Sequence, residues 1–418
     1  MNSRLRISVN ELRLGMSVID LDRPWLETPF LIQGFILSTE ADIKAVQQYC
    51  RFVYIDPNRA ALPTSTKDRG QPQLDRNRSF GLFQRREPPP ARKSVEAELV
   101  DARKVHARTS TLVRGFMDDI RFGRVLNVKA IEEGVADTVD SILNNPDAMQ
   151  WLAQLRKKDS SHEQHCLNSC ILTVAFGRQL GLPREELKKL GICALLHDVG
   201  KLQIPDSILN KVLPLSEPEL ATLRKHTDFG RVILMSAREL YHGAIDVAHS
   251  HHEWVDGTGY PRKLNGGQIS PFAKMIAIVD TYDDIIAEHS YRPERTAFEA
   301  LKEINGGRGK QFDESLVKHF IDMIGVFPVG SIVELSTGEV GIVLAQSINR
   351  PMLPRVVLLL DSKKQPRKEQ ILNLALAAAD TTATPRVIRV LRRGDYGLDP
   401  QQLQERGLMA TTILKTTA

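Results

Sequence analysis

Candidate metal-binding side chains gather in residues 162–289, which hold nine of the eleven histidines in the chain. His197 and Asp198 place a nitrogen and an oxygen ligand on adjacent residues, and His251 and His252 add two further imidazoles. Mixed imidazole and carboxylate ligands without thiolates suit iron, manganese, nickel, cobalt or zinc. These residue types therefore predict a transition-metal site.

Several of these side chains stand at the ends of apolar segments. His197 ends a helical pattern that is apolar on most sides, and Asp280 follows the apolar run Met275–Val279. A buried histidine or aspartate is costly unless it is bonded to a partner. One histidine at the end of a core helix is more often a hydrogen-bonded core residue, so that alternative stays open for each residue alone. Several such residues at the ends of separate apolar elements favour one shared site.

The chemistry that such a site supports is phosphodiester hydrolysis. Two divalent ions about 3.5–4 Å apart could share a carboxylate, generate a hydroxide near neutral pH and clamp the oxygens of a phosphoryl group. Lys201 follows the His197–Asp198 pair by one short turn, where a fixed cation could hold a phosphate oxygen. The alternative for Lys201 is an ordinary surface lysine at a helix end.

The elements expected to position these residues are helices. Apolar residues recur at steps of three and four over residues 99–120 and 128–142, which is the period of an amphipathic helix. Gly181 is typical of the residue after a helix end, and Pro183 suits the first turn of the next helix. The other helices predicted for this part cover residues 149–155, 163–181 and 183–197.

Shorter β-branched and aromatic runs flank the helical part on both sides. They are bounded by turn residues, which is typical of strands, and one helix ending near Tyr49 lies among the N-terminal runs. The predicted fold class is therefore mainly α, with a central helical bundle, a small N-terminal α/β domain and a small C-terminal β appendage. The predicted strands cover residues 6–9, 16–19, 31–37, 52–55, 331–335, 340–344 and 355–360.

Composition divides the chain further. Proline, arginine, glutamine and serine dominate residues 57–93, so this segment buries too little apolar surface to fold alone and is predicted to be a flexible linker. Its arginines could instead touch nucleic acid or a membrane surface. The predicted domains are residues 1–56 (α/β), 57–93 (linker), 94–325 (helical), 326–380 (β) and 381–418 (tail).

The bulk properties argue against several classes of protein. The net charge of +5 over 418 residues is too small to argue for nucleic acid as a partner. No apolar run approaches the ~20 residues of a membrane span, and Met1 does not lead into the apolar core of a signal peptide. Four cysteines without a disulfide framework fit a reducing compartment. We therefore expect a cytoplasmic protein.

Three motifs occur in order along the chain: His197-Asp198-Val199-Gly200-Lys201, His251-His252-Glu253 and Gly259-Tyr260-Pro261. Together they closely resemble the HD-GYP family, which are bacterial phosphodiesterases of cyclic di-GMP within the HD superfamily. The resemblance covers roughly residues 165–320. Residues 12–25 also resemble the domain of unknown function that often precedes HD-GYP domains.

The resemblance implies a metal-ligand set and a substrate-binding set. Asp198 would bridge two ions, and Lys201 would contact the phosphate. Glu253, Asp256 and Asp283 would orient the ligands from behind. The implied metal ligands are His165, His197, Asp198, His226, His251, His252 and Asp280; the implied catalytic residues are His197, Asp198 and Lys201, and the implied substrate-binding residues are Lys201, Tyr260 and Arg292.

Two departures from the family pattern affect these expectations. Some members hold a third metal through a glutamate four residues before the first histidine, where this chain has Ser161, so two ions are expected. Many members have an arginine where His289 stands, although Arg292 nearby could still hold a phosphate or a guanine. Iron or manganese is the expected metal, with nickel, cobalt or zinc as alternatives.

The activity that the resemblance implies is hydrolysis of cyclic di-GMP to linear pGpG, with GMP as a further product, which ends a second-messenger signal. Two alternatives stay open: a non-catalytic cyclic di-GMP receptor, and an HD hydrolase of another cyclic dinucleotide. The resemblance also implies contacts of the Gly259-Tyr260-Pro261 loop with a diguanylate cyclase or other signalling proteins. The helices between residues 95 and 143 could pair with a second copy in a homodimer, or pack within the chain.

Overall fold

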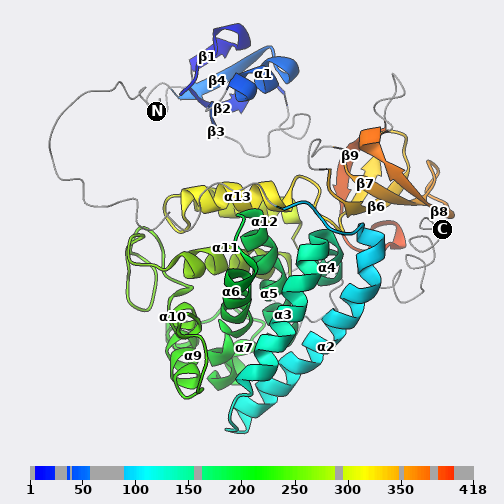
Figure 1. The fold of residues 1–418 in the computed structure, drawn as a ribbon. Helices are drawn as coiled ribbons and strands as arrows, with labels where there is room; N and C mark the ends of the chain where they lie inside the picture. Colours follow the sequence, from blue (N-terminus) through cyan, green and yellow to red (C-terminus); the bar gives the residue numbers. More distant parts are fainter. Residues whose placement is uncertain are drawn as a thin grey trace. The chain divides into compact units, whose positions relative to one another are not determined.

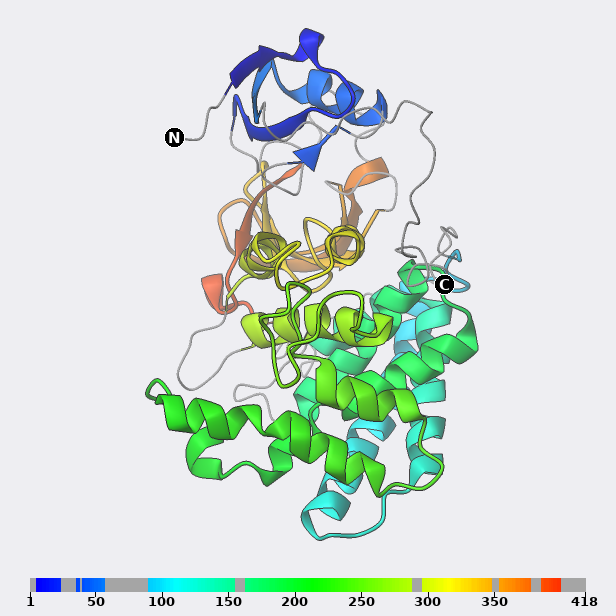
Figure 2. The same ribbon diagram turned by 90° about the vertical axis from the view of Figure 1, so that its left-hand side faces the viewer.

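The computed structural model describes residues 5–23, 35–37, 40–56, 89–154, 162–287, 295–347, 353–376 and 385–399. The chain separates into two compact units, Met1–Asp75 and Arg76–Ala418. Each unit is described by itself below, and Figures 1 and 2 show the course of the chain in two views.

The N-terminal unit is a small sheet with one helix, as predicted. Its four strands pair antiparallel in the order β1-β4-β2-β3, and Val18, Val46 and Val53 are fully buried in its core. Residues 31–34 of the predicted third strand lie outside the described residues. The elements are β1 (Leu5–Ser8), η1 (Val9–Glu11), β2 (Ser17–Leu21), β3 (Phe35–Ile36), α1 (Glu40–Tyr49) and β4 (Phe52–Asp56).

The second unit contains the predicted helical bundle (Figure 1). Ser94 and Asn127 accept hydrogen bonds from backbone amides of the first turns of α2 and α3, so polar caps begin both helices. Pro146 opens α4, where its missing amide costs nothing. The first five helices are α2 (Val95–Arg121), α3 (Val128–Asn144), α4 (Pro146–Gln154), α5 (His162–Gln179) and α6 (Arg184–Leu196), which confirms the predicted ones.

Helix α5 forms the centre of the bundle. Its residues from Cys166 to Arg178 are all buried, and α2, α3, α4, α6, α11 and α13 pack around it. A helix buried on every side fixes its neighbours relative to one another. The later elements are η4 (Val199–Gln203), α7 (Asp206–Leu209), α8 (Glu217–Arg224), α9 (His226–Met235), α10 (His242–Ser250), α11 (Pro271–Ile286), α12 (Ala297–Gly306) and α13 (Glu314–Ile324).

The C-terminal sheet is larger than the predicted appendage. Its five strands pair antiparallel in the order β8-β7-β6-β5-β9. Its last strand comes from residues beyond 380, which were predicted to form a tail. No helix in the described part of the chain is long and apolar enough to cross a membrane. The strands are β5 (Ile332–Leu335), β6 (Val340–Ala345), β7 (Arg355–Leu360), β8 (Pro366–Asn373) and β9 (Val387–Leu391).

Three aromatic rings tie α11 to the centre of the bundle. The Phe320 ring lies 5.3 Å from the rings of both Phe176 and Tyr282, edge to face in each case. All three side chains are fully buried. This cluster anchors α11, which carries Asp280, against α5 and α13.

We expect Phe320→Ala to lower the free energy of unfolding of the helical unit by about 3–5 kcal/mol, because it leaves a cavity between three helices. Phe298→Ala is the matched control, since Phe298 is 36% exposed on α12. Denaturant unfolding followed by far-UV circular dichroism measures both. Equal losses in the two variants would contradict the anchoring role.

Candidate metal centre

Five separate elements bring the predicted ligands together. His165 lies in the first turn of α5, and His197 ends α6, with Asp198 directly before η4. His226 begins α9, and Asp280 lies within α11. His251 and His252 follow the end of α10.

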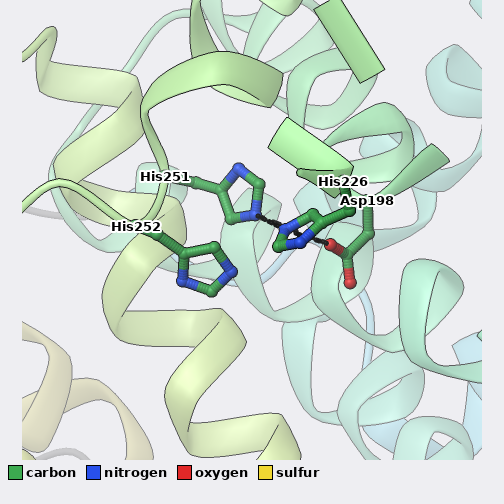
Figure 3. A group of neighbouring side chains, drawn as sticks. All are labelled: Asp198, His226, His251 and His252. Carbon is green, nitrogen blue, oxygen red and sulfur yellow. Dashed lines mark hydrogen bonds and ion pairs between the residues drawn. The ribbon is translucent and has the colours of Figure 1, made fainter. Parts of the chain in front are cut away.

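The first group joins Asp198, His226, His251 and His252, whose ligand atoms all lie within 4.8 Å of one another (Figure 3). The Nε2 atoms of His226 and His251 are 3.4 Å apart. They lie 3.4 Å and 3.5 Å from Oδ1 of Asp198. Two imidazoles therefore face one oxygen of this carboxylate, and His252 completes the group.

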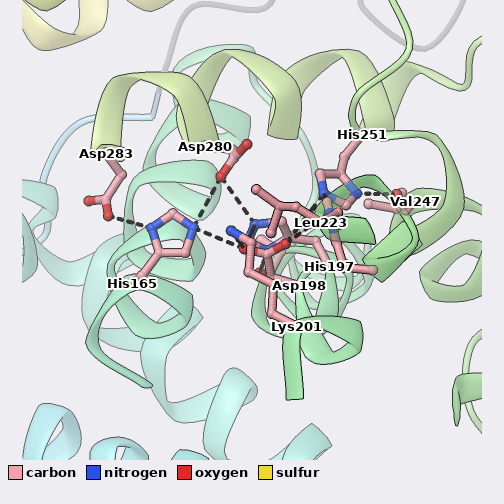
Figure 4. A network of polar contacts seen from close by, with 11 residues as sticks. His165, His197, Asp198, Lys201, Leu223, Val247, His251, Asp280 and Asp283 are labelled. Carbon is pink, nitrogen blue, oxygen red and sulfur yellow. Dashed lines mark hydrogen bonds and ion pairs between the residues drawn. The ribbon is translucent and has the colours of Figure 1, made fainter. Parts of the chain in front are cut away.

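The second group joins His165, His197, Asp198 and Asp280 within the same limit (Figure 4). Nε2 of His165 is 3.0 Å from Oδ1 of Asp280 and 3.5 Å from Oδ2 of Asp198. Nε2 of His197 is 3.4 Å and 3.6 Å from the same two oxygens. Asp198 belongs to both groups and turns a different oxygen toward each, which is the geometry of a bridging carboxylate.

The histidine rings are oriented by hydrogen bonds on the side away from the centre. In three of them Nδ1 faces a backbone carbonyl, which can only accept, so Nδ1 carries the proton and Nε2 presents a lone pair to the centre. The pairs are His197 with Ala194 (2.7 Å), His226 with Leu223 (2.7 Å) and His251 with Val247 (3.0 Å).

His165 is oriented by a carboxylate instead. Its Nδ1 is 2.8 Å from Oδ2 of Asp283, and Figure 4 shows the ring between Asp283 and Asp280. A carboxylate behind a histidine is a common support of metal ligands. Burial lowers the pKa of His165, but contacts with Asp198, Asp280 and Asp283 outweigh burial and raise it well above its usual value. A proton and a metal ion compete for its Nε2, so metal binding there releases a proton.

The buried charges also prepare the first group for a cation. Burial raises the pKa of Asp198, but the ammonium of Lys201 and the surrounding imidazoles outweigh burial and hold that pKa well below its ordinary range. Burial lowers the pKa of His226 to about 4 and holds that of His252 well below its usual value. The carboxylate is therefore ionised at pH 7, and both imidazoles are neutral.

Several oxygen and nitrogen atoms that face the centre lack a good hydrogen-bond partner in the described part of the chain, as expected of metal ligands. Within the described residues, neither oxygen of Asp198 accepts a hydrogen bond of normal geometry, although Lys201 forms an ion pair with Oδ2. The lone pairs of His226 and His251 face each other across 3.4 Å, which is unfavourable without a cation or a proton between them. A divalent ion in each group would satisfy these atoms together. The two groups could therefore hold metal ions.

The loop after His252 packs on the centre. The Tyr260 ring stacks on the His252 ring, with centroids 4.8 Å apart and planes 23° apart. A Cβ on Gly259 would lie 2.2 Å from the backbone nitrogen of Trp254, so only glycine fits there. Glu253 accepts hydrogen bonds from the backbone amides of residues 262 and 264. Glu253 was predicted to orient a metal ligand, but these hydrogen bonds hold the loop instead.

All seven predicted ligands lie in the two groups, and Lys201 contacts Asp198. Asp256 was predicted to orient a ligand, but its carboxylate is exposed and accepts hydrogen bonds from Thr258. Arg292 lies outside the described residues. The three carbonyl supports were missed, although each stands three or four residues before its histidine. That spacing at a helix end is the signal that could have found them. The ligand roles themselves stay predictions.

Models of two known protein families match parts of this chain. A model of the HD domain matches residues 148–316, and a model of a domain of unknown function (DUF3391) matches residues 4–131. A helical domain of this kind, with two His/Asp groups that share a carboxylate, defines the class of HD-domain hydrolases.

Relatives narrow that class. A cyclic di-GMP phosphodiesterase of Pseudomonas aeruginosa is 33% identical over 376 residues, which is 89% of this chain and 89% of that protein. Another, of Thermotoga maritima, is 25% identical over 237 residues, or 56% and 64% of the two chains. A 3′3′-cGAMP-specific phosphodiesterase of Vibrio cholerae is 37% identical over 143 residues, or 34% and 27%. This chain belongs to the HD-GYP family.

We expect Gly200→Ala to disrupt the first group, because a Cβ there would lie 1.8 Å from the carbonyl oxygen of His226 and push α9 away from η4. The metal content should fall, and the free energy of unfolding should fall by about 3 kcal/mol. Gly115→Ala is the control, since a Cβ at Gly115 meets no atom within 4 Å. Metal analysis and thermal unfolding measure the two effects. A Gly200→Ala protein with unchanged metal content and stability would show that the close approach is unimportant.

Proposed function

We propose that this chain hydrolyses cyclic di-GMP to linear pGpG, with GMP as a further product, at the metal centre of its helical domain. The observation that carries the proposal is the Asp198 carboxylate shared by two buried groups of imidazoles and carboxylates. The Pseudomonas aeruginosa phosphodiesterase, which is 33% identical over 89% of this chain, supports the choice of substrate. The reaction ends a second-messenger signal.

Two divalent ions would occupy the centre. His165, His197, Asp198 and Asp280 would hold one, and Asp198, His226, His251 and His252 would hold the other. Such a pair supplies a hydroxide at neutral pH and neutralises the oxygens of the phosphoryl group. Iron or manganese suits these nitrogen and oxygen ligands, with nickel, cobalt or zinc as alternatives.

The protein's own side chains orient the reacting groups. The ammonium of Lys201 contacts Oδ2 of Asp198 while 26% of its side chain stays exposed, so it can also donate to a phosphate oxygen. His197 and Asp198 would serve as ligands at the end of α6, where both side chains are fully buried. Tyr260 shields His252 and borders the substrate. Arg292 would complete the binding of substrate.

A second candidate substrate has one observation in its favour. The Vibrio cholerae relative that acts on 3′3′-cGAMP is 37% identical over 143 residues of this chain. Because guanine is common to both nucleotides, the same centre could cut either, and a panel of cyclic dinucleotides separates them. A non-catalytic receptor has no such support, since binding alone does not require two groups of metal ligands. A cytoplasmic location, a homodimer and a signalling partner at the Tyr260 loop remain our predictions.

We expect Asp198→Ala to lower turnover of cyclic di-GMP at least about a hundredfold. Removing a residue that only supports a metal ligand usually lowers activity about ten- to a hundredfold, and Asp198 is itself a predicted ligand of both groups. Asp137→Ala is the control, since Asp137 is 49% exposed and pairs with Arg108 on the outer surface. Chromatography of the nucleotide products, with protein loaded anaerobically with iron or manganese, measures both. A wild-type protein that holds metal and leaves cyclic di-GMP uncut would refute the proposed function.

A further inference from the structure

Arg224 is an exposed cation at the edge of the metal centre. It ends α8, two residues before His226. Its guanidinium carbon lies 5.4 Å from the centroid of the Tyr260 ring. Its side chain is exposed, and among the described residues no acidic side chain forms an ion pair with it, so its N–H donors are available to a ligand.

Tyr260 places this guanidinium next to the first metal group. The Tyr260 ring stacks on His252 and lies edge to face with His226, at a centroid distance of 6.4 Å. Arg224, Tyr260 and His252 thus form a continuous series of contacts from solvent to a predicted ligand. A guanidinium against an aromatic ring is held in place by the ring's electrostatic attraction.

Lys201 lies at the other group. Its ammonium pairs with Oδ2 of Asp198, the oxygen that faces His165 and His197. Two cations therefore flank the centre, Lys201 at the second group and Arg224 at the first. Lys201 offers a point charge to one phosphate oxygen, whereas Arg224 offers a planar fork that matches paired acceptors.

A cyclic dinucleotide has a second half that the metal ions cannot hold. Only one of its two phosphates is cut at a time, so the other phosphate and its guanine extend beyond the two groups. Both present paired acceptors to a guanidinium, the phosphate through two oxygens and guanine through O6 and N7. We infer that Arg224 binds the uncut half of the cyclic dinucleotide through two parallel hydrogen bonds. This inference rests on the proposed function.

The kinetics of Arg224→Gln test this role on two substrates. The variant should raise KM for cyclic di-GMP about ten- to a hundredfold, with kcat nearly preserved, because it loses a charged pair of hydrogen bonds. Bis(para-nitrophenyl) phosphate carries no second nucleotide for Arg224 to bind. The fall in kcat/KM that Arg224→Gln causes should therefore be at least about fivefold smaller on this substrate than on cyclic di-GMP. Arg224→Lys should recover part of the affinity, since it keeps the charge without the fork. Arg231→Gln is the matched control, because Arg231 is another exposed arginine, on α9.

The outcomes separate this inference from the proposed function. If kcat/KM of Arg224→Gln falls equally on both substrates, Arg224 only supports the Tyr260 loop. If kcat/KM does not fall on either substrate, Arg224 has no role. Either result overturns this inference and leaves the proposed function standing. A wild-type protein that cannot cut cyclic di-GMP overturns the inference and the proposed function together. The contact itself is identified by competition with cyclic di-AMP, whose adenine has a donor in place of O6. If Arg224→Gln lowers the preference for cyclic di-GMP over cyclic di-AMP, Arg224 contacts the guanine base. If the variant binds both nucleotides equally less tightly, Arg224 contacts the phosphate. Both results support the inference.

Discussion

The shared carboxylate of Asp198 is the feature on which the rest of the centre depends. It is fully buried, and each oxygen faces a different set of imidazole nitrogens. An ionised carboxylate in a protein interior costs several kcal/mol unless positive charge compensates it. Lys201 compensates one side only, at Oδ2. A cation held in each of the two groups would compensate the carboxylate from both sides, and the two groups could hold metal ions.

The fold supports this carboxylate through backbone geometry more than through additional charges. Gly200 allows η4 to touch the backbone of His226, and Gly259 allows the Tyr260 loop to close over His252. Backbone carbonyls fix three of the imidazoles, so their orientation depends on where helices end. Since these contacts involve main-chain atoms, small changes of side-chain volume at the two glycines should act directly on the ligands.

Much of this architecture could be predicted from the sequence, for identifiable reasons. The apolar period of α2 and α3 is regular, and polar caps mark their first turns, so both helices were predicted correctly. Imidazoles and carboxylates at the ends of apolar elements are rare without a shared function, and this pattern singled out five candidate ligands: His197, Asp198, His251, His252 and Asp280. His165 and His226 were predicted only from the resemblance to the HD-GYP family. The division of the ligands between two groups was not evident, because it depends on side-chain directions from five elements.

Other features have weak local signals. Strand β9 has only five residues and pairs with β5, whose residues lie far earlier in the sequence, so it was placed in a tail. Glu253 looked like a support for a ligand because it adjoins His252, yet its partners are amides of the loop. Arg224 belongs to no motif, and only the position of Tyr260 gives it significance. Contacts between distant segments account for each of these differences.

The most direct measurement of the shared carboxylate is the metal content of matched variants prepared without oxygen. The account predicts about two equivalents of metal in the wild-type protein and about one in both His165→Ala and His252→Ala, which each remove a ligand from one group only. Asp198→Ala, which removes a ligand from both groups, should retain almost none while staying folded by circular dichroism. An Asp198→Ala protein that keeps two equivalents would contradict the account, because the ions would then not depend on the carboxylate between them.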